Sequence, residues 1–303
     1  MKQFLLLGLA LTLNFSAGAQ EMRRQQLEIS HDNDFLLTTD RYYSSGLFLT
    51  YRRIPERGLL SEEGEQFSLR LGQEVYTPSD VSSRNTEDFD RPYAGLSGLW
   101  TRWTKADENT LWEGRVLLGR TGPSSRAGSF QRWYHRNVVL YLVPAWEAEI
   151  ADAWQANFYL KYLREWELAP VPFGVRLAVL GEMSWGTLEQ YVQPEIALYL
   201  GRRGALHNSI AHGRLGSSER EIFMALRASY RCVGHNSLIE GNKGSTASSF
   251  TTLALSGVWR FGFDFNHRYG RHDYKVIYRM IGRETPDQNR FHQYIGLAYG
   301  LAF

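Results

Sequence analysis

Two stretches decide the fold, Leu27-Glu-Ile-Ser-His-Asp-Asn-Asp-Phe35 and, just after it, Thr39-Asp-Arg-Tyr-Tyr-Ser-Ser-Gly46. In the first, Leu27 and Ile29 alternate with polar residues, which is the pattern of a β-strand with one apolar face and one polar face. This strand runs into the polar residues 32–34, and a second strand follows. The sequence therefore predicts a hairpin whose tip carries carboxylate and amide groups.

The composition favours a β-barrel that spans a membrane. Aromatic residues make up 14% of the 303 residues, yet the mean hydropathy is only −0.37. No run of roughly 18 apolar residues follows the N-terminal segment, which excludes membrane-spanning helices. A barrel strand exposes only alternate residues to lipid, so its apolar signal is diluted. The single cysteine, Cys232, allows no internal disulfide, and a closed barrel does not need one.

The N-terminal segment predicts export. Lys2 precedes an apolar run over residues 4–13, and Ala17-Gly-Ala19 resembles a small-residue cleavage site. We therefore expect a signal peptide at 1–19 and one barrel domain over 20–303, in the bacterial outer membrane. The net charge of +2 identifies no partner. We expect outer-membrane lipids around the barrel, no nucleic acid, and a monomer.

Alternation bounded by turn residues defines the strands. The segments are about 25–35, 43–54, 65–77, 93–105, 109–121, 154–168, 171–183, 190–203, 220–232, 250–262, 272–283 and 290–303. We therefore predict an all-β fold, a twelve-stranded antiparallel transmembrane β-barrel, since bacterial barrels have an even number of strands. Both termini would then lie on the periplasmic side. The turn at 204–219 is longer than is usual on that side.

With both termini on the periplasmic side, the connections after the first, third and fifth strands, at 36–42, 78–92 and 122–153, would lie outside the cell. Only the third is helix-like: residues 126–143 lack proline and carry aromatic residues at helical spacing, and Pro144 ends the pattern. We expect a short extracellular helix that is aromatic on one side and basic on the other, as at a lipid headgroup interface.

Polar residues at the hairpin tip form the first candidate site. Asn33, Asp34, Asp40 and Ser44 offer oxygen atoms of the kind that Ca²⁺ prefers. Asn33 and Asp34 would point to opposite faces of a regular strand, so one site can use both only if the strand ends or bulges there. Ordinary solvated loop polarity, with Asx-turn hydrogen bonds, is the alternative.

Other candidates lie on the second and third outer connections. His135, on the expected helix, could act as a general base, and Gln131 shares its helix face. A polar surface histidine is the alternative. Arg84 and Arg91 could bind phosphate groups of a substrate, or they could form ion pairs with acidic residues of their own loop.

Together these motifs resemble the outer-membrane lipid A 3′-O-deacylase family. The resemblance is carried by Asn33-Asp34, Thr39-Asp-Arg-Tyr-Tyr-Ser-Ser-Gly46, Tyr76-Thr-Pro78, Asp90-Arg-Pro-Tyr-Ala-Gly95, Gly122-Pro123, Gln131-Arg-Trp-Tyr-His135 and Pro144-Ala-Trp146. It covers the N-terminal half of the chain. Around and after Trp146 the chain departs from the family pattern, at Ala145, Glu149, Ile150 and Ala153.

The resemblance implies a twelve-stranded barrel with an active site at its outer rim, beneath an extracellular helix. It implies catalytic roles for His135, Asp34, Asn33 and Ser44, and lipid A of lipopolysaccharide as the substrate. By analogy with secreted phospholipase A2, His135 would activate a water molecule, and Ca²⁺ would polarise the ester carbonyl without an acyl-enzyme. Asp34 and Asn33 would be the calcium ligands, although Asp34 could instead orient the imidazole.

Two rival functions stay open at this point. The chain could be a non-catalytic barrel, either a pore or a lipopolysaccharide-binding protein. It could also be a phospholipase that uses the same chemistry on glycerolipids. The candidate polar rim residues favour an enzyme, because a non-catalytic relative would not need them.

Overall fold

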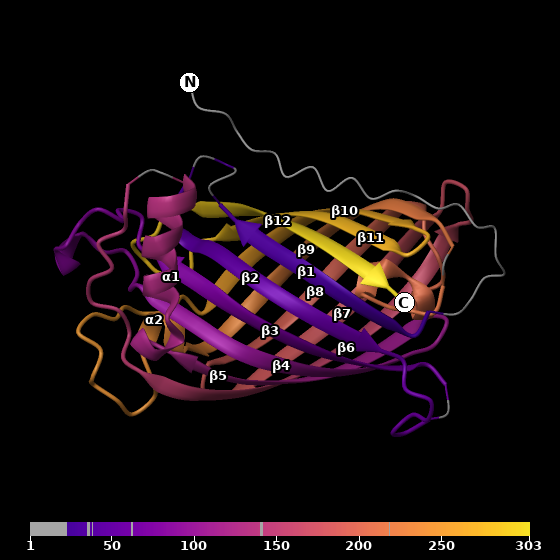
Figure 1. The fold of residues 1–303 in the computed structure, drawn as a ribbon, viewed down its shortest axis with the longest axis horizontal. Coiled ribbons are helices and arrows are strands. Elements are labelled where there is room, and N and C mark those ends of the chain that lie inside the picture. The colour runs from indigo at the N-terminus through magenta and orange to yellow at the C-terminus, as the bar shows by residue number, and fades with distance from the viewer. Residues whose placement is uncertain (1–22, 35–36, 38, 62, 140–141, 218) are drawn as a thin grey trace.

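The computed structural model describes residues 23–303 except 35–36, 38, 62, 140–141 and 218. The expected signal peptide at 1–19 lies outside the described residues. Twelve strands form one closed antiparallel barrel (Figure 1). They are β1 (Gln25–Asn33), β2 (Tyr42–Arg53), β3 (Glu65–Thr77), β4 (Ala94–Ala106), β5 (Thr110–Thr121), β6 (Ala153–Ala169), β7 (Val175–Gly186), β8 (Glu189–Arg202), β9 (Glu221–Asn236), β10 (Gly257–Tyr269), β11 (His272–Gly282) and β12 (Phe291–Ala302). The predicted fold is confirmed.

Closure comes from β1, which pairs with β2 on one side and with β12 on the other. The alternation read from the sequence sets the two faces of the wall. Leu27 and Ile29 are 46% and 54% exposed on the outside, whereas Gln26 and Glu28 are buried on the inside. The barrel therefore turns an apolar surface outward and encloses a polar interior, as expected for a membrane-spanning barrel. No described helix is long and apolar enough to cross a membrane.

The prediction for the tenth strand was wrong. It was placed at 250–262, but β10 begins at Gly257 and continues to Tyr269. Residues 250–256 belong to the connection that follows α2 (Ser237–Glu240). There the backbone N–H groups of Thr252 and Leu255 bond to the carbonyls of Ile239 and Glu284 rather than to a strand ladder. Residues 250–256 show the alternation of a strand without forming one, so the pattern predicted a strand that begins too early.

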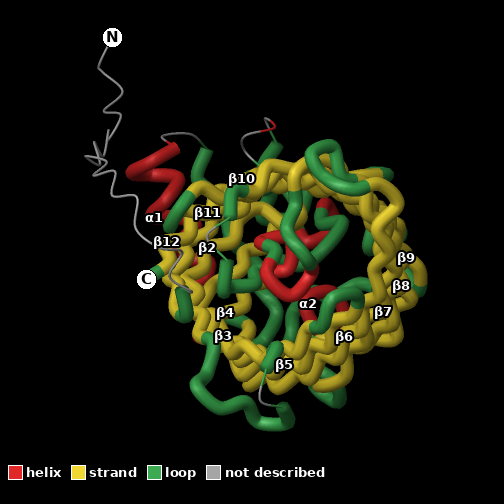
Figure 2. The backbone as a smooth tube through the Cα atoms, turned by 90° about the vertical axis from the view of Figure 1, so that its right-hand side faces the viewer, coloured by secondary structure: helices red, strands yellow, loops and turns green. Residues whose placement is uncertain are grey.

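The expected outer helix is present but shorter than predicted. The α-helix α1 spans Ala127–Tyr134, and a π-helical turn follows over His135–Val139. Residues 140–141, in the last part of the predicted helix, lie outside the described residues. Figure 2 shows α1 outside the ring of strands, so this helix rests on the outer wall and does not enter the lumen.

The long β8–β9 turn folds back into the barrel at the end where β1 begins and β12 ends (Figure 1). Two 3₁₀ turns, Leu206–Asn208 and Ile210–His212, shape it. Gln66 and Arg102 from the wall donate hydrogen bonds to the carbonyls of Gly213 and His212, at 2.8 and 2.7 Å. Leu206 and Ile210 are fully buried within this end of the barrel. We call residues 203–220 the plug.

Between the plug and the outer loops the lumen keeps two polar cavities of about 490 and 340 Å³. Acidic and basic side chains of the wall line both of them, and several are paired across neighbouring strands, such as Arg52 with Glu28 at 2.6 Å. The candidate residues His135, Asp34 and Ser44 line neither cavity. The lumen and the candidate site are therefore separate places.

Candidate active site

The candidate site begins where β1 ends and β2 is irregular. β1 ends at Asn33, and the backbone N–H of Asp34 donates to the carbonyl of Ser44 at 3.3 Å. On the other side of β2 the pairing with β3 shifts between Tyr43 and Ser45, so Ser44 is the extra residue of a bulge. The sequence analysis required a strand end or a bulge at this point. β1 meets this requirement by ending at Asn33, and β2 carries a bulge at Ser44. Ser44 is thereby turned toward the outer connection.

Asp34 is almost completely buried in the β1–β2 connection, at 1% exposure. Its Oδ2 accepts hydrogen bonds from the Arg41 backbone N–H at 2.7 Å and from the Thr39 hydroxyl at 3.2 Å. Its Oδ1 is buried and has no hydrogen-bond partner. Burial, together with the nearby carboxylate of Asp40, raises the pKa of Asp34 to about 8.

α1 is held against the outer wall by close backbone packing. The hydroxyl of Ser125 accepts a hydrogen bond from the N–H of Ala127 at the start of the helix. A Cβ on Gly128 would lie 2.2 Å from the indole nitrogen of Trp146, and one on Gly95 of β4 would lie 2.2 Å from Cβ of Ala127. Glycine at both positions therefore lets the helix approach β4 on one side and Trp146 on the other.

The helix brings His135 to the bulge of β2. His135 is 3% exposed. Its Nδ1 lies 2.6 Å from the carbonyl oxygen of Leu142, and a carbonyl can only accept, so Nδ1 carries a proton. In the neutral ring Nε2 then has a free lone pair. Nε2 lies 3.0 Å from the amide nitrogen of Gln131 and 3.4 Å from Oδ2 of Asp40.

Asp40 and Ser44 complete this cluster. The Ser44 hydroxyl donates to Oδ1 of Asp40 at 2.8 Å and accepts from the Gln131 amide at 3.2 Å. Burial raises the pKa of Asp40, and the neighbouring His135 partly offsets this. We call these four residues, His135, Gln131, Ser44 and Asp40, the His135 cluster. It joins the first and third outer connections, as the sequence predicted.

The cluster lies on the outer, lipid-facing side of the wall. Alternation along β1 puts His31 and Asn33 on the same face as the exposed Leu27 and Ile29. The His31 ring lies 6.3 Å from that of Tyr134 on α1, which confirms that the helix covers this face. Exposed apolar side chains also lie before and after His135 along its own segment. They are Trp133, Val138 and Leu142.

The comparisons with known proteins concern the whole chain. The sequence matches the family described as outer membrane protein LpxR over residues 5–303. The chain belongs to that family. No match was found among curated protein sequences.

A solved structure with a TM-score above 0.5 supports the same fold. The chain is similar to LpxR from Salmonella typhimurium, with a TM-score of 0.76 and 18% identity over 92% of this chain and 100% of that one. A weaker likeness, with a TM-score of 0.47 and 13% identity, joins it to the β domain of the Bordetella autotransporter BrkA over 93% of this chain and 100% of that one. For the KdgM porin the TM-score is 0.42, with 7% identity over 92% of this chain and 99% of the porin chain.

In this LpxR-family barrel the two arginines predicted to bind substrate lie outside the His135 cluster. Arg84 is exposed on the β3–β4 connection. Arg91 is 1% exposed, with its guanidinium 3.4 Å from Glu284 and 4.7 Å from the centre of the Tyr76 ring. Its contacts are therefore those of a residue that ties loops together. A substrate contact for either arginine stays a prediction.

The residues proposed as calcium ligands fit a hard cation in part. The unpartnered Oδ1 of Asp34 is a buried acceptor that a cation would satisfy. Asn33 is buried beside it at the end of β1. Among the described residues, no group of three or more His, Cys, Asp or Glu side chains could hold a metal ion. Amide, backbone or substrate oxygens would therefore have to complete the coordination.

Two groups that contact His135, the carboxylate of Asp40 and the carbonyl of Leu142, were not predicted from the sequence to act on the imidazole. Asp40 was noted only as a possible calcium ligand, because its distance from His135 depends on how the β1–β2 connection folds. The carbonyl of Leu142 had no sequence signal, since any residue supplies a carbonyl. The i,i+4 spacing of Gln131 and His135 predicted that these two side chains share a helix face, and their nitrogens lie 3.0 Å apart.

Proposed function

We propose that this protein is an outer-membrane lipid A 3′-O-deacylase, which hydrolyses the 3′-linked acyloxyacyl ester of lipopolysaccharide. Membership of the outer membrane protein LpxR family supports the outer-membrane setting and the substrate class. One observation carries the chemistry. His135 is buried, its Nδ1–H donates a hydrogen bond to the carbonyl of Leu142, and Nε2 is therefore the basic nitrogen.

In this scheme His135 acts as a general base on a water molecule. The water oxygen attacks the ester carbonyl carbon, and its proton passes to Nε2. Base catalysis of this kind contributes about 10²–10⁴-fold. Asp34 and Asn33 would hold Ca²⁺, which supplies a positive charge to polarise the ester carbonyl. The exposed Trp133, Val138 and Leu142 would meet acyl chains at the depth where the ester lies.

The position of the site suits a lipid substrate. A lipid in the outer leaflet can reach the outer wall beside α1 without passing through the lumen (Figure 2). The pore alternative is less favoured, because the plug fills one end of the barrel. The cluster itself does not separate lipid A from a glycerolipid, so the assay has to include both.

The decisive experiment compares His135→Ala with the wild-type barrel on purified lipid A and on phospholipid, with mass spectrometry of the released fatty acids. We expect His135→Ala to fold and to release acyl groups at least about 10²-fold more slowly. The control is His207→Ala, which removes a histidine of the plug at the opposite end. Wild-type rates in His135→Ala would refute the mechanism, and release from phospholipid alone would refute the substrate.

A further inference from the structure

The hydrogen bonds of Ser44 do not suit a nucleophile. A serine that attacks an ester needs its proton directed at a base. Here the hydroxyl proton goes to Oδ1 of Asp40 at 2.8 Å, and the oxygen accepts from the Gln131 amide at 3.2 Å. The basic Nε2 of His135 faces Gln131 and Asp40 instead. Ser44 is therefore arranged to hold a carboxylate in place.

The carboxylate that Ser44 holds lies beside the imidazole of His135. Oδ2 of Asp40 lies 3.4 Å from Nε2, and both side chains are largely removed from water, at 18% and 4% exposure. The other titratable groups that face this segment are Tyr134, whose ring lies 6.3 Å from the imidazole, and Asp34, which interacts with Asp40. A negative charge at this distance stabilises the protonated imidazole far more than the neutral one.

We propose that Asp40 is a positioning residue that stabilises the imidazolium form of His135 during hydrolysis, and that Ser44 holds its carboxylate rather than attacking the ester. The inference rests on the proposed function. A water molecule that donates to Nε2 takes the place of one Gln131 N–H, and the second N–H keeps its bond to Ser44.

The atoms balance without a covalent intermediate. The water oxygen bonds to the carbonyl carbon, and its proton goes to Nε2 beside Asp40. The ester carbon–oxygen bond then breaks, and Nε2 returns the proton to the leaving alkoxide. The products are a free fatty acid and the deacylated alcohol. Asp40 stays ionised throughout and exchanges no proton.

The first test is Asp40→Asn, which keeps an acceptor for Ser44 and removes the charge. Because the charge that stabilises the protonated ring is removed, kcat should fall at least about tenfold while KM changes little, and Asp40→Glu, which keeps the charge, should restore part of the loss. The control is Asp287→Asn, an exposed carboxylate on the β11–β12 connection at the same end of the barrel.

The readout is kcat and KM on purified lipid A, determined separately for each variant. A kcat of Asp40→Asn equal to that of Asp287→Asn overturns this inference even if the wild-type protein is an active deacylase. A wild-type protein that leaves lipid A intact overturns the proposed function instead, so the two failures are distinguishable.

The second test concerns Ser44. Ser44→Ala should keep measurable activity, about 1–10% of the wild type, because the water and the base remain. Ser44→Thr, which keeps the hydroxyl, should restore most of it. Complete loss in Ser44→Ala, together with an acyl group trapped on Ser44 of the wild-type protein, would overturn the assignment.

Discussion

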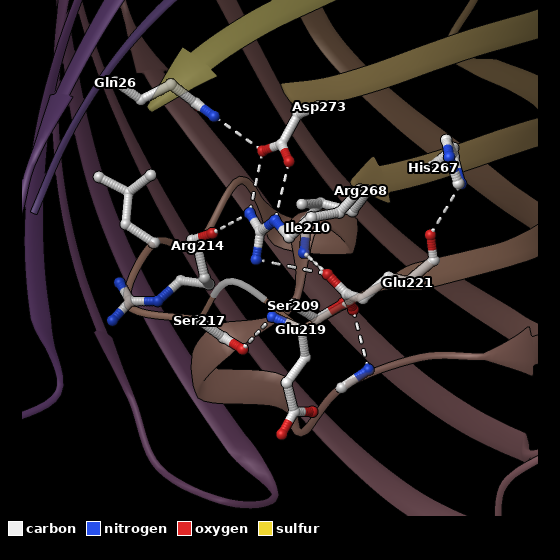
Figure 3. A network of polar contacts seen from close by, with 12 residues as sticks. Gln26, Ser209, Ile210, Arg214, Ser217, Glu219, Glu221, His267, Arg268 and Asp273 are labelled. Atoms are coloured by element: carbon white, nitrogen blue, oxygen red, sulfur yellow. Dashed lines mark hydrogen bonds and ion pairs between the residues drawn. The ribbon is translucent and has the colours of Figure 1, made fainter. Parts of the chain in front are cut away.

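Arg268, near the periplasmic end of β10, should be a major stabilising residue of the barrel. Figure 3 shows its guanidinium at the centre of the network that holds the plug. It forms a two-point ion pair with Asp273, at 2.8 and 2.9 Å, and donates to the carbonyls of Asn208 and Arg214, each at 2.8 Å. Arg268 and Asp273 are only 3% and 4% exposed.

The substitution Arg268→Met keeps most of the side-chain volume and removes all of these interactions. Breaking a buried ion pair costs about 3–5 kcal/mol, because the remaining charge stays buried. Asp273 would keep its 2.7 Å hydrogen bond from Gln26, which favours the lower end of that range. We therefore expect the free energy of unfolding to fall by about 3 kcal/mol.

The assay is a urea titration in detergent micelles, followed by tryptophan fluorescence. Arg271→Met is the matched control, because Arg271 is an exposed arginine of the adjacent β10–β11 turn and its loss should change stability by less than about 0.5 kcal/mol. If Arg268→Met unfolds at the same urea concentration as Arg271→Met, the plug contributes nothing through this network and the reasoning is wrong.

Two further predictions concern the proposed active site. Gly128→Val should lower deacylation at least about tenfold without destabilising the barrel, because even a Cβ would lie 2.2 Å from the Trp146 indole and α1 would have to move His135; wild-type activity would show that the helix position is unimportant. Chelation with EDTA should stop the reaction and added Ca²⁺ should restore it, and unchanged rates in chelator would remove the metal from the scheme.

The sequence predicted the barrel because its physical signal is repeated twelve times. Each strand needs an apolar outer face and ends at a turn, so errors at single strands do not alter the architecture. The tenth strand shows the limit. Leu253 and Leu255 alternate with small or polar residues as in a strand, but they lie in a connection before β10. Only pairing with β9 and β11 sets the register, and a single sequence does not contain that information.

The plug was not predictable for a related reason. Its polar contacts join residues far apart in the sequence, such as Gln66 with Gly213 and Arg268 with Asn208. The sequence showed only that 204–219 is long for a periplasmic turn. Nothing local distinguishes a turn that extends into solvent from one that folds into the lumen.

Local sequence patterns predicted some of the residues that the structure brings together at the candidate site, but not their mutual contacts. The spacing of Gln131 and His135 and the polar hairpin tip each gave a local signal, and the structure brings them together at Ser44. The roles of Asp40 and of the Leu142 carbonyl depend on distances between the first and third connections. Such distances appear only after the strands are in register.

Because the His135 cluster lies on the outside of the wall, the relevant substrate concentration under the proposed function is that within the surrounding lipid and not that in solution. A lipid that stays in the leaflet arrives by diffusion in two dimensions, past Trp133 and Val138. Its rate of encounter should then follow the mole fraction of substrate in the surrounding lipid or detergent, and should be insensitive to how many vesicles or micelles the solution contains.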